Sequence, residues 1–336
     1  MKKINFKALA FILVISILFL SCSKNDVVEN QLSTNVYAAG YEYNGTHNVA
    51  KYWKNGIPVD LTHGSNDAEL TSIYISGNDV YAAGYEYNNL NAVAKYWKNG
   101  VENILSNGSK GVLTNSICIV SDDVYVGGTE YNNINNTAIA KYWKNGVSVN
   151  LTDGSKHEES TGIFIVGTDV YVTGWESSNG SRVAKYWKNG TPIYLSNGAE
   201  ATNLYVSGYD IYVSGYGSDG AKYWKNGVAT TLIGKNNYSS SIFVSENNVY
   251  ISGYERFGAT NNIAKYWKNG ISIPLSDGSN DAFTTSISIS QNDIYVSGYE
   301  NKNSYVVAKY WKNGTATNLT DGTKDSRVNS IFVDIK

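Results

Sequence analysis

One hexapeptide, Lys-Tyr-Trp-Lys-Asn-Gly, recurs without substitution through most of this 336-residue sequence. Its copies begin at Lys51, Lys95, Lys141, Lys185, Lys222, Lys265 and Lys309, so they recur every 37 to 46 residues. A period of this length is typical of chains that stack one supersecondary unit many times, as solenoids and propellers do. The repeat therefore narrows the possible folds before any other feature is considered.

One repeat unit has the pattern of four short strands. Residues 72–76 alternate small or polar residues with apolar ones, and residues 79–86 are apolar on both faces. These patterns predict a half-buried strand followed by a strand covered on both sides. Residues 92–97 and 101–105 predict two more strands, because the Asn-Gly pair between them favours a type I′ hairpin turn. Each unit is therefore predicted to be a four-stranded antiparallel meander, which is the blade of a β-propeller.

The two ends of the repeat region are complementary fragments of one unit. The region starts at a second strand, residues 35–40, and stops after a first strand, residues 330–334. Pairing of these fragments would close a ring and leave few free sheet edges, whereas an open solenoid gains nothing from such a split. The sequence predicts an all-β, seven-bladed β-propeller over residues 34–336, closed by pairing of the C-terminal strand with the N-terminal blade fragment. A solenoid or another number of blades is the alternative.

The first 21 residues have the pattern of an export signal. Two lysines follow Met1, residues 8–20 are almost entirely apolar, and Ser21 precedes Cys22. Such a run is too short to span a bilayer as a helix and fits a signal peptide. The stretch Leu-Phe-Leu-Ser-Cys, followed by Ser-Lys-Asn-Asp, resembles the lipobox of bacterial lipoproteins in its Bacteroidetes form.

That resemblance implies a lipidated Cys22, a tether over residues 22–33, and a bacterial protein anchored in the outer membrane or at the cell surface. Several acyl chains, palmitate among them, would hold it at the membrane without a transmembrane helix. An ordinary secretory peptide is the alternative. The repeats themselves resemble bacterial tandem-repeat β-propellers, and the closure is similar to that of WD-repeat and kelch proteins. Neither signature is present, so the resemblance supplies no site residues.

Charge and cysteine content exclude two further classes. Without residues 1–21 the chain has 24 basic and 29 acidic residues, a net charge of −5. A nucleic-acid partner would call for a basic excess or stripe, so none is predicted. With Cys22 acylated, Cys118 has no partner, and no disulfide framework is expected. The apolar residues around Cys118 predict a small buried hydrophobe rather than a reactive thiol.

Strand direction sorts the connections between strands into two ends. The turns within each hairpin are short and uniform, whereas the loops between second and third strands and the links between units are longer and vary. Loops on a rigid scaffold usually carry function, so the varied end is the predicted binding face. Six units place a glutamate there, and an aromatic residue precedes five of them. These candidate binding residues are Glu42, Glu86, Glu130, Glu176, Glu255 and Glu300 with Tyr41, Tyr85, Trp175, Tyr254 and Tyr299.

Two interpretations of the glutamates stay open. A ring of carboxylates beside aromatic rings suits cations, cationic groups or sugar hydroxyls. The favoured interpretation is a cross-strand ion pair with the lysine that opens each hexapeptide, such as Glu86 with Lys95, worth roughly 0.2–1 kcal/mol. The hexapeptide is likewise expected to be structural, because Trp53 and Trp97 lie on strands that must pack between blades.

No cofactor or metal is predicted, although some links between units read Asp-x-Ser/Thr-x-Asp. One example is Asp277, Ser279 and Asp281, which places oxygen ligands at alternate positions as calcium loops do. The glycine falls at the wrong place and no bidentate glutamate follows, so polar turns are favoured over calcium. The histidines have no repeated partner, and no phosphate loop or nucleophile elbow is visible.

The sequence favours an exported, membrane-anchored lipoprotein that acts as a non-enzymatic binding or scaffold module for a protein or glycan partner. One alternative is a propeller-type glycan hydrolase or lyase that uses carboxylates of the glutamate ring, since fold does not determine function. A structural or adhesive spacer without a defined ligand is the other alternative.

Overall fold

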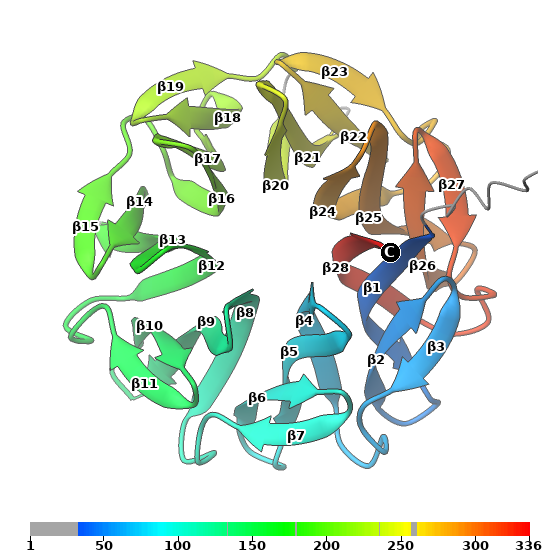
Figure 1. Cartoon of the computed structure of the whole chain (residues 1–336), viewed down its shortest axis with the longest axis horizontal. Helices are drawn as coiled ribbons and strands as arrows, with labels where there is room; N and C mark the ends of the chain where they lie inside the picture. Colours follow the sequence, from blue (N-terminus) through cyan, green and yellow to red (C-terminus); the bar gives the residue numbers. More distant parts are fainter. Residues whose placement is uncertain (1–32, 133, 179, 235, 257–260) are drawn as a thin grey trace, which may run out of the picture. The chain divides into compact units, whose positions relative to one another are not determined.

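The computed structural model describes residues 33–336 except 133, 179, 235 and 257–260. The predicted signal peptide, Cys22 and the tether up to residue 32 lie outside the described residues. Across the described part of the chain, 28 strands form seven four-stranded antiparallel sheets arranged in a ring (Figure 1). The predicted seven-bladed, all-β propeller with four strands per blade is confirmed. Within these residues, no helix is long and apolar enough to cross a bilayer.

In every sheet the first strand of the repeat unit lies innermost and the fourth lies at the rim (Figure 1). The innermost strands are β4 (Ala68–Ser76), β8 (Gly111–Val120), β12 (Glu158–Val166), β16 (Glu200–Ser207), β20 (Asn237–Ser245), β24 (Ala282–Ser290) and β28 (Ser326–Ile335). The second strands are β1 (Thr34–Tyr43), β5 (Asp79–Tyr87), β9 (Asp123–Asn132), β13 (Asp169–Ser178), β17 (Asp210–Gly217), β21 (Asn248–Arg256) and β25 (Asp293–Lys302).

The third strands carry the hexapeptide, and the fourth strands are short and exposed. The third strands are β2 (Asn48–Lys54), β6 (Ala92–Lys98), β10 (Thr137–Lys144), β14 (Ser181–Lys188), β18 (Gly220–Lys225), β22 (Asn262–Lys268) and β26 (Tyr305–Lys312). The fourth strands are β3 (Ile57–Asp60), β7 (Val101–Ile104), β11 (Val147–Asn150), β15 (Thr191–Tyr194), β19 (Val228–Thr231), β23 (Ile271–Pro274) and β27 (Thr315–Asn318).

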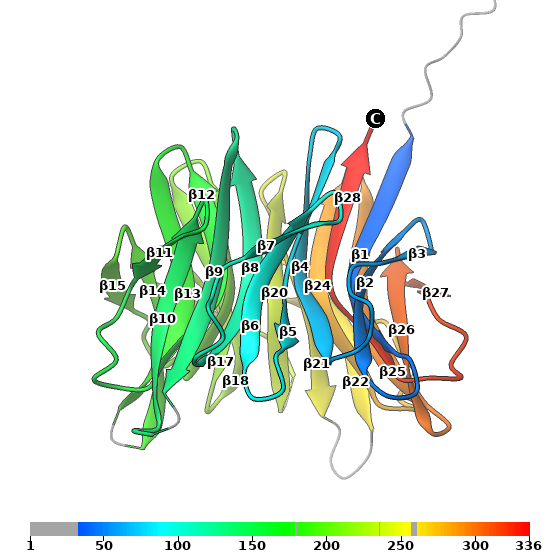
Figure 2. The same cartoon turned by 90° about the horizontal axis from the view of Figure 1, so that it is seen from below.

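One sheet joins the two ends of the repeat region, and its strand order is β28-β1-β2-β3. β28 runs antiparallel beside β1, with Ile331 opposite Ala38 and Phe332 opposite Tyr37 (Figure 2). The C-terminal strand therefore occupies the innermost place of a blade whose other three strands come from the N-terminal side.

The hydrophobic core lies between neighbouring blades. Trp97 of β6, for example, packs with Tyr37, Ala39 and Ala50 of the preceding blade. The hexapeptide tryptophan is only 0–2% exposed in all seven copies. Burial of aromatic rings in such cores contributes heavily to stability. The structural interpretation of this tryptophan is confirmed.

The Asn-Gly pair of each hexapeptide forms the tight turn that the sequence predicts. Asn99 has φ 50° and Gly100 has φ 82°, and the other copies have nearly the same values. Both residues are therefore left-handed, as a type I′ turn requires. The Asn99 side chain also accepts a hydrogen bond from the Val80 backbone N–H at 2.9 Å, which ties the turn to the second strand.

Each innermost strand carries a one-residue bulge that the sequence analysis did not predict. In β4 the register with β5 slips between Leu70 and Ser72, which leaves Thr71 without a partner. The equivalent bulged residues in the other strands are Asn115, Thr161, Thr202, Ser240, Thr285 and Asn329. A bulge re-aims the extra side chain, and here each bulged side chain hydrogen-bonds to the following blade.

The bulge explains why the second strand needs a glycine opposite the residue that precedes the bulge. Gly84 pairs with Leu70, and a Cβ on Gly84 would lie 2.2 Å from the backbone oxygen of Glu69. At the other copies the same added atom would come within 1.9 to 2.6 Å of the matching carbonyl oxygen. The glycine therefore allows the first two strands to pair closely beside the bulge.

We expect Gly84→Ala to lower the free energy of unfolding by about 2 kcal/mol or more, because the added methyl group collides with the paired backbone of the innermost strand at Glu69 and Leu70. Urea denaturation measures the change. The matched control is Gly111→Ala at the start of β8, where an added Cβ meets no atom within 4 Å. Equal losses in the two variants would contradict the steric explanation.

Candidate functional site

The second strands of the propeller end at the face that carries the longer loops, and we call this end the loop face. Figure 2 shows the hairpin turns at the opposite end, beside the C-terminus. The candidate glutamates and their aromatic neighbours lie at the loop-face ends of the second strands. Their positions relative to the innermost and third strands decide what each can contact.

Each candidate glutamate contacts the lysine that opens the hexapeptide on the neighbouring strand. The Oε2 to Nζ distances are 2.6 Å for Glu42–Lys51, 2.7 Å for Glu86–Lys95 and 2.7 Å for Glu176–Lys185. The remaining pairs are Glu130–Lys141, Glu255–Lys265 and Glu300–Lys309. These lysines are all buried, so the carboxylates neutralise positive charges that are held away from water. Lys51, Lys95 and Lys185 each contact a second carboxylate as well, from Asp60, Glu102 and Glu158. The ion-pair interpretation is confirmed, and binding by these carboxylates stays a prediction.

The blade without this glutamate satisfies its lysine differently. Gly217 stands at the glutamate position, and the loop that follows is the shortest of its kind. Asp219 from that loop contacts Lys222 Nζ, which also donates to the Asn197 backbone carbonyl at 2.8 Å. The lysine is only 1% exposed, so the shortened loop supplies the anion that the strand lacks.

The aromatic residues point away from the glutamates, because successive residues of a strand face opposite sides. Tyr85, for example, lies opposite Glu69 of the innermost strand, whereas Glu86 contacts the third strand. Burial is the main cause that raises the pKa of Tyr41 to about 12. The structure therefore separates the predicted ring of carboxylates from the predicted aromatic residues.

The aromatic residues instead pair with a position that the sequence analysis missed. Each of these second-strand positions lies opposite one residue of the innermost strand. With the second-strand residue first, the pairs are Tyr41–Arg327, Tyr85–Glu69, Thr129–Leu113, Trp175–Glu159, Tyr216–Glu200, Tyr254–Tyr238 and Tyr299–Phe283. We call these seven cross-strand pairs the belt. The signal was present in the sequence, because this is a position where otherwise similar units change both charge and size.

Contacts along the belt run from one blade to the next. Ring centroids are 5.2 Å apart for Tyr216–Tyr238, 4.9 Å for Tyr254–Phe283 and 5.1 Å for Phe283–Tyr299. The Arg327 guanidinium lies 4.6 Å from the Tyr299 ring centroid. Such edge-to-face, stacked and cation–π contacts are each worth about 0.5–1.5 kcal/mol. The belt is therefore a continuous packed layer over these blades.

Carboxylates in the belt accept hydrogen bonds from tyrosine hydroxyls. Tyr216 donates to Glu200 Oε2 at 2.6 Å. Burial and the neighbouring Glu200 raise the pKa of Tyr216, so this hydroxyl keeps its proton at neutral pH. Burial likewise raises the pKa of Glu69, although a hydrogen bond from Tyr85 opposes that shift.

The belt is most elaborate around Trp175. Its ring lies between the Arg182 guanidinium, 4.0 Å from the ring centroid, and the His157 ring, with centroids 5.3 Å apart. The Glu159 carboxylate lies 2.7 Å from His157 Nε2, within hydrogen-bond distance. Arg182 Nη1 donates a hydrogen bond to Glu200 Oε2 at 2.5 Å. Arg182 therefore connects two blades while half of its side chain stays exposed.

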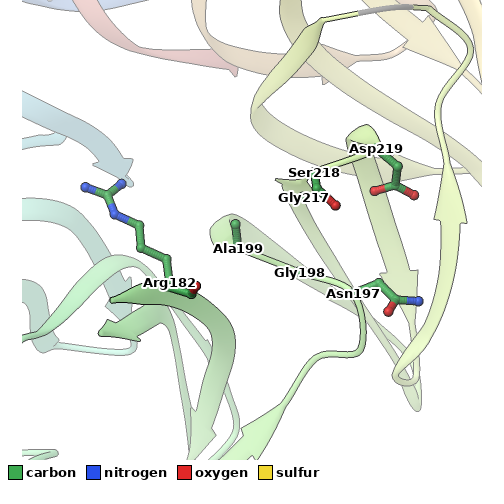
Figure 3. A pocket seen from close by; sticks show the side chains of 8 residues that line it. Arg182, Asn197, Gly198, Ala199, Gly217, Ser218 and Asp219 are labelled. Carbon is green, nitrogen blue, oxygen red and sulfur yellow. The ribbon is translucent and has the colours of Figure 1, made fainter. Parts of the chain in front are cut away.

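Two adjoining hollows in the loop face share Ser181 and Arg182. The first has a volume of about 730 Å³, and Figure 3 shows Arg182 across from the short loop Gly217, Ser218 and Asp219. The second has a volume of about 550 Å³, and its lining includes Lys156, His157 and Trp175. Volumes of this size fall in the range of ligand pockets. Both hollows are lined by several polar side chains, and they are built around loops in which the repeat units differ.

The acidic links between units are tied into turns by their own hydrogen bonds. Asp277 Oδ1 accepts from the Ser279 N–H at 2.9 Å and from its hydroxyl at 2.6 Å. Asp281 Oδ1 accepts from the Asn262 N–H at 2.7 Å. Hydrogen bonds from Ser279 lower the pKa of Asp277. Among the described residues, no group of three or more His, Cys, Asp or Glu is placed to hold a metal ion.

Comparisons with known proteins show the fold and no family. No family model matches the chain, and no curated protein matches its sequence. A puromycin-hydrolyzing peptidase from Mycobacterium tuberculosis is similar with TM-score 0.54 and 8% identity, over 86% of this chain and 53% of that one. Acylaminoacyl peptidase from Pyrococcus horikoshii is similar with TM-score 0.52 and 12% identity, over 86% and 51%.

A sialidase from Trypanosoma rangeli in complex with sialic acid is also similar, with TM-score 0.45 and 9% identity, over 78% of this chain and 53% of the sialidase. The chain thus spans about half the length of these three proteins. The similarity to the two peptidases, at identities of 8% and 12%, shows the fold alone and carries no site residue from one protein to another.

We expect Glu176→Gln to lower the free energy of unfolding by about 2 kcal/mol at pH 7, because Lys185 loses a charge-assisted hydrogen bond in a buried position. Burial favours protonation of Glu176, but hydrogen bonds from Lys185 and Lys156 outweigh it and hold its pKa at about 2, below its usual value of 4.5. A carboxyl group with a lowered folded-state pKa stabilises the fold above its unfolded-state pKa. The difference between wild type and variant should therefore shrink as the pH falls from about 4.5 to about 2.

Urea denaturation at a series of pH values measures this difference. The matched control is Glu102→Gln, which removes a carboxylate equally close to a lysine, Lys95, at 2.7 Å but 40% exposed. Exposed pairs contribute about 0–1 kcal/mol, so the control should change little. A pH-independent effect of Glu176→Gln would contradict the ion-pair explanation.

Proposed function

We propose that the protein is a non-enzymatic binding module whose loop face holds a glycan or protein partner, with a glycan favoured. The observation that carries the proposal is the pair of adjoining hollows that share Arg182. Loops from three neighbouring blades build them, and these loops depart from the repeat. At the other end, by contrast, the Asn-Gly turns have nearly the same φ values in all seven copies.

The chemistry of the hollows favours a glycan. Their described lining presents serine, asparagine, lysine, histidine and arginine side chains, with Trp175 almost buried beneath Arg182 and His157. Hydroxyl-rich chains are recognised by converging donors and acceptors of this kind, whereas the centres of protein interfaces are more apolar and depleted in charge. In such a wide hollow, a hydroxyl-rich ligand would replace its hydrogen bonds to water with direct or water-mediated hydrogen bonds to the protein at little cost in free energy.

The same lining argues for binding rather than hydrolysis. Among the described residues that line the two hollows, the carboxylate is Asp219. Its contact with Lys222 lowers the pKa of Asp219, so it stays ionised and is a poor general acid. Glycoside hydrolysis by the common route needs two carboxyl groups flanking the bond. The glycan hydrolase or lyase alternative therefore has less support than binding.

The test of the loop face uses residues 23–336, which contain every described strand and core residue. A glycan array identifies ligands, and titration calorimetry measures their affinity. We expect Arg182→Ala to weaken binding at least tenfold, because it removes an exposed cation shared by both hollows. Lys312→Ala is the matched control. The Lys312 side chain is 46% exposed, close to the 51% of Arg182, and it is also ion-paired, but it lies at the hairpin end.

Three outcomes would contradict this proposal. The first is binding that is equally strong in Arg182→Ala, and the second is an equal loss in both variants. The third is turnover of a bound glycan by the wild type, which would establish an enzyme. Thermal unfolding of both variants checks that each remains folded.

We further propose that the module is anchored to the bacterial outer membrane or cell surface through a lipid on Cys22. The support is the signal-like segment with its resemblance to a lipobox. When the full chain is expressed in a bacterium with an alkyne-labelled fatty acid, we expect label on the wild type and none on Cys22→Ala. Equal labelling of both, or release of the wild type as an unlabelled soluble protein, would contradict lipidation.

A further inference from the structure

A cavity unlike the two hollows of the loop face lies among the innermost strands, between their bulges and the hairpin turns. Its volume is about 320 Å³, and all seven innermost strands contribute to its lining. The lining is mainly apolar with a few polar groups, such as Asn203 and Ser286, which is the usual character of a small-molecule site. The volume is near the lower end of the range for such sites, so a compact ligand is implied.

Each innermost strand contributes one inward-facing residue at the same register, opposite the buried tyrosine of the second strand. Five of the seven are aromatic and form two separate groups. Tyr74 packs on Phe332 with centroids 5.0 Å apart. Tyr205 packs between Phe164 and Phe243, at 5.0 Å and 4.8 Å.

The other two strands carry small residues at this register, and these separate the aromatic groups. Cys118 of β8 lies between Tyr74 and Phe164 along the ring, and Ser288 of β24 lies between Phe243 and Phe332. A ring of seven large aromatic residues would crowd the centre. The two small residues instead leave a slot with an aromatic wall on each side.

The slot also contains hydrogen-bond donors without partners. Neither the Tyr74 hydroxyl nor the Tyr205 hydroxyl forms a hydrogen bond with any described residue, and the two tyrosines belong to opposite walls. Burial raises the pKa of Tyr74 to about 12, so its hydroxyl remains a donor. Polar groups in partly buried positions normally find a partner, from protein, water or ligand.

We propose that this slot binds a compact, flat aromatic molecule that carries a hydrogen-bond acceptor. Two aromatic walls favour a planar ring, because rings gain from offset or edge-to-face packing. The unpartnered hydroxyls then supply donors to a carbonyl or similar oxygen. A sugar chain does not fit this apolar slot, so the site is distinct from the hollows of the loop face and does not depend on them.

The probe for the test is 6-propionyl-2-(dimethylamino)naphthalene, a flat fluorophore with one carbonyl acceptor whose emission shifts to the blue in apolar surroundings. With residues 23–336 we expect a saturable blue shift at one probe per chain. Ser288→Phe closes one gap with the residue that three equivalent positions already carry, so the fold should tolerate it. We expect that variant to bind the probe at least tenfold more weakly.

Two further variants make the test specific. Cys118→Phe closes the opposite gap and replaces Ser288→Phe if that variant does not fold. Tyr74→Phe with Tyr205→Phe keeps both walls, removes both hydroxyls and should weaken binding about tenfold, the effect of losing hydrogen bonds of ordinary strength. The control is Tyr209→Ala, which removes a fully exposed aromatic residue from a hairpin turn and should leave binding unchanged.

Unchanged probe affinity in a folded gap-closing variant would overturn the proposal. So would an equal loss in Tyr209→Ala, because the probe would then bind the outer surface. Binding that depends on the gaps but not on the two hydroxyls would remove the acceptor requirement and overturn the proposal in its stated form.

Discussion

The propeller depends on how neighbouring blades are held at the centre of the ring. Each innermost strand carries a bulge, and the bulged side chain hydrogen-bonds to the next blade. Thr285 Oγ1 donates to the Val328 carbonyl, and Asn329 Nδ2 donates to the Leu70 carbonyl, both at 2.8 Å. With these two bonds, the series of hydrogen bonds between neighbouring blades continues through the sheet that is built from both ends of the chain. Because they lie where blades are closest, they set the register of one blade against the next.

Around this centre, the invariant hexapeptide satisfies several requirements within six residues. Its first lysine neutralises a carboxylate at the loop face, as Lys95 does with Glu86 at 2.7 Å. Its tryptophan fills the gap between blades, and its Asn-Gly pair forms the left-handed turn into the fourth strand. A change to the first lysine, the tryptophan or the Asn-Gly pair would therefore lose a buried contact or a left-handed turn, which is a physical reason why these residues are the same in all copies.

Differences among the units gather in two places along the central strands. At the loop face they produce the belt and the two hollows around Arg182, where charge and hydrogen bonding dominate. Nearer the hairpin turns they produce the aromatic slot, where Cys118 and Ser288 interrupt the aromatic residues. The scaffold residues can repeat because every blade packs on a similar neighbour. Positions that face the centre are free to differ, because each meets a different set of side chains.

The sequence by itself determined the blade, the number of blades and the ion pairs, because these rest on local spacing that repeats. Period-two patterns, Asn-Gly turns and the separation of 9 to 11 residues between the glutamate and the lysine of each ion pair need no knowledge of distant residues. Tertiary structure alone decided the bulges, the belt and the slot. Glu200 meets Arg182 of another blade, and Tyr74 meets Phe332 from the other end of the chain. No local pattern encodes such contacts, because they arise only when residues of different blades are brought together in the ring.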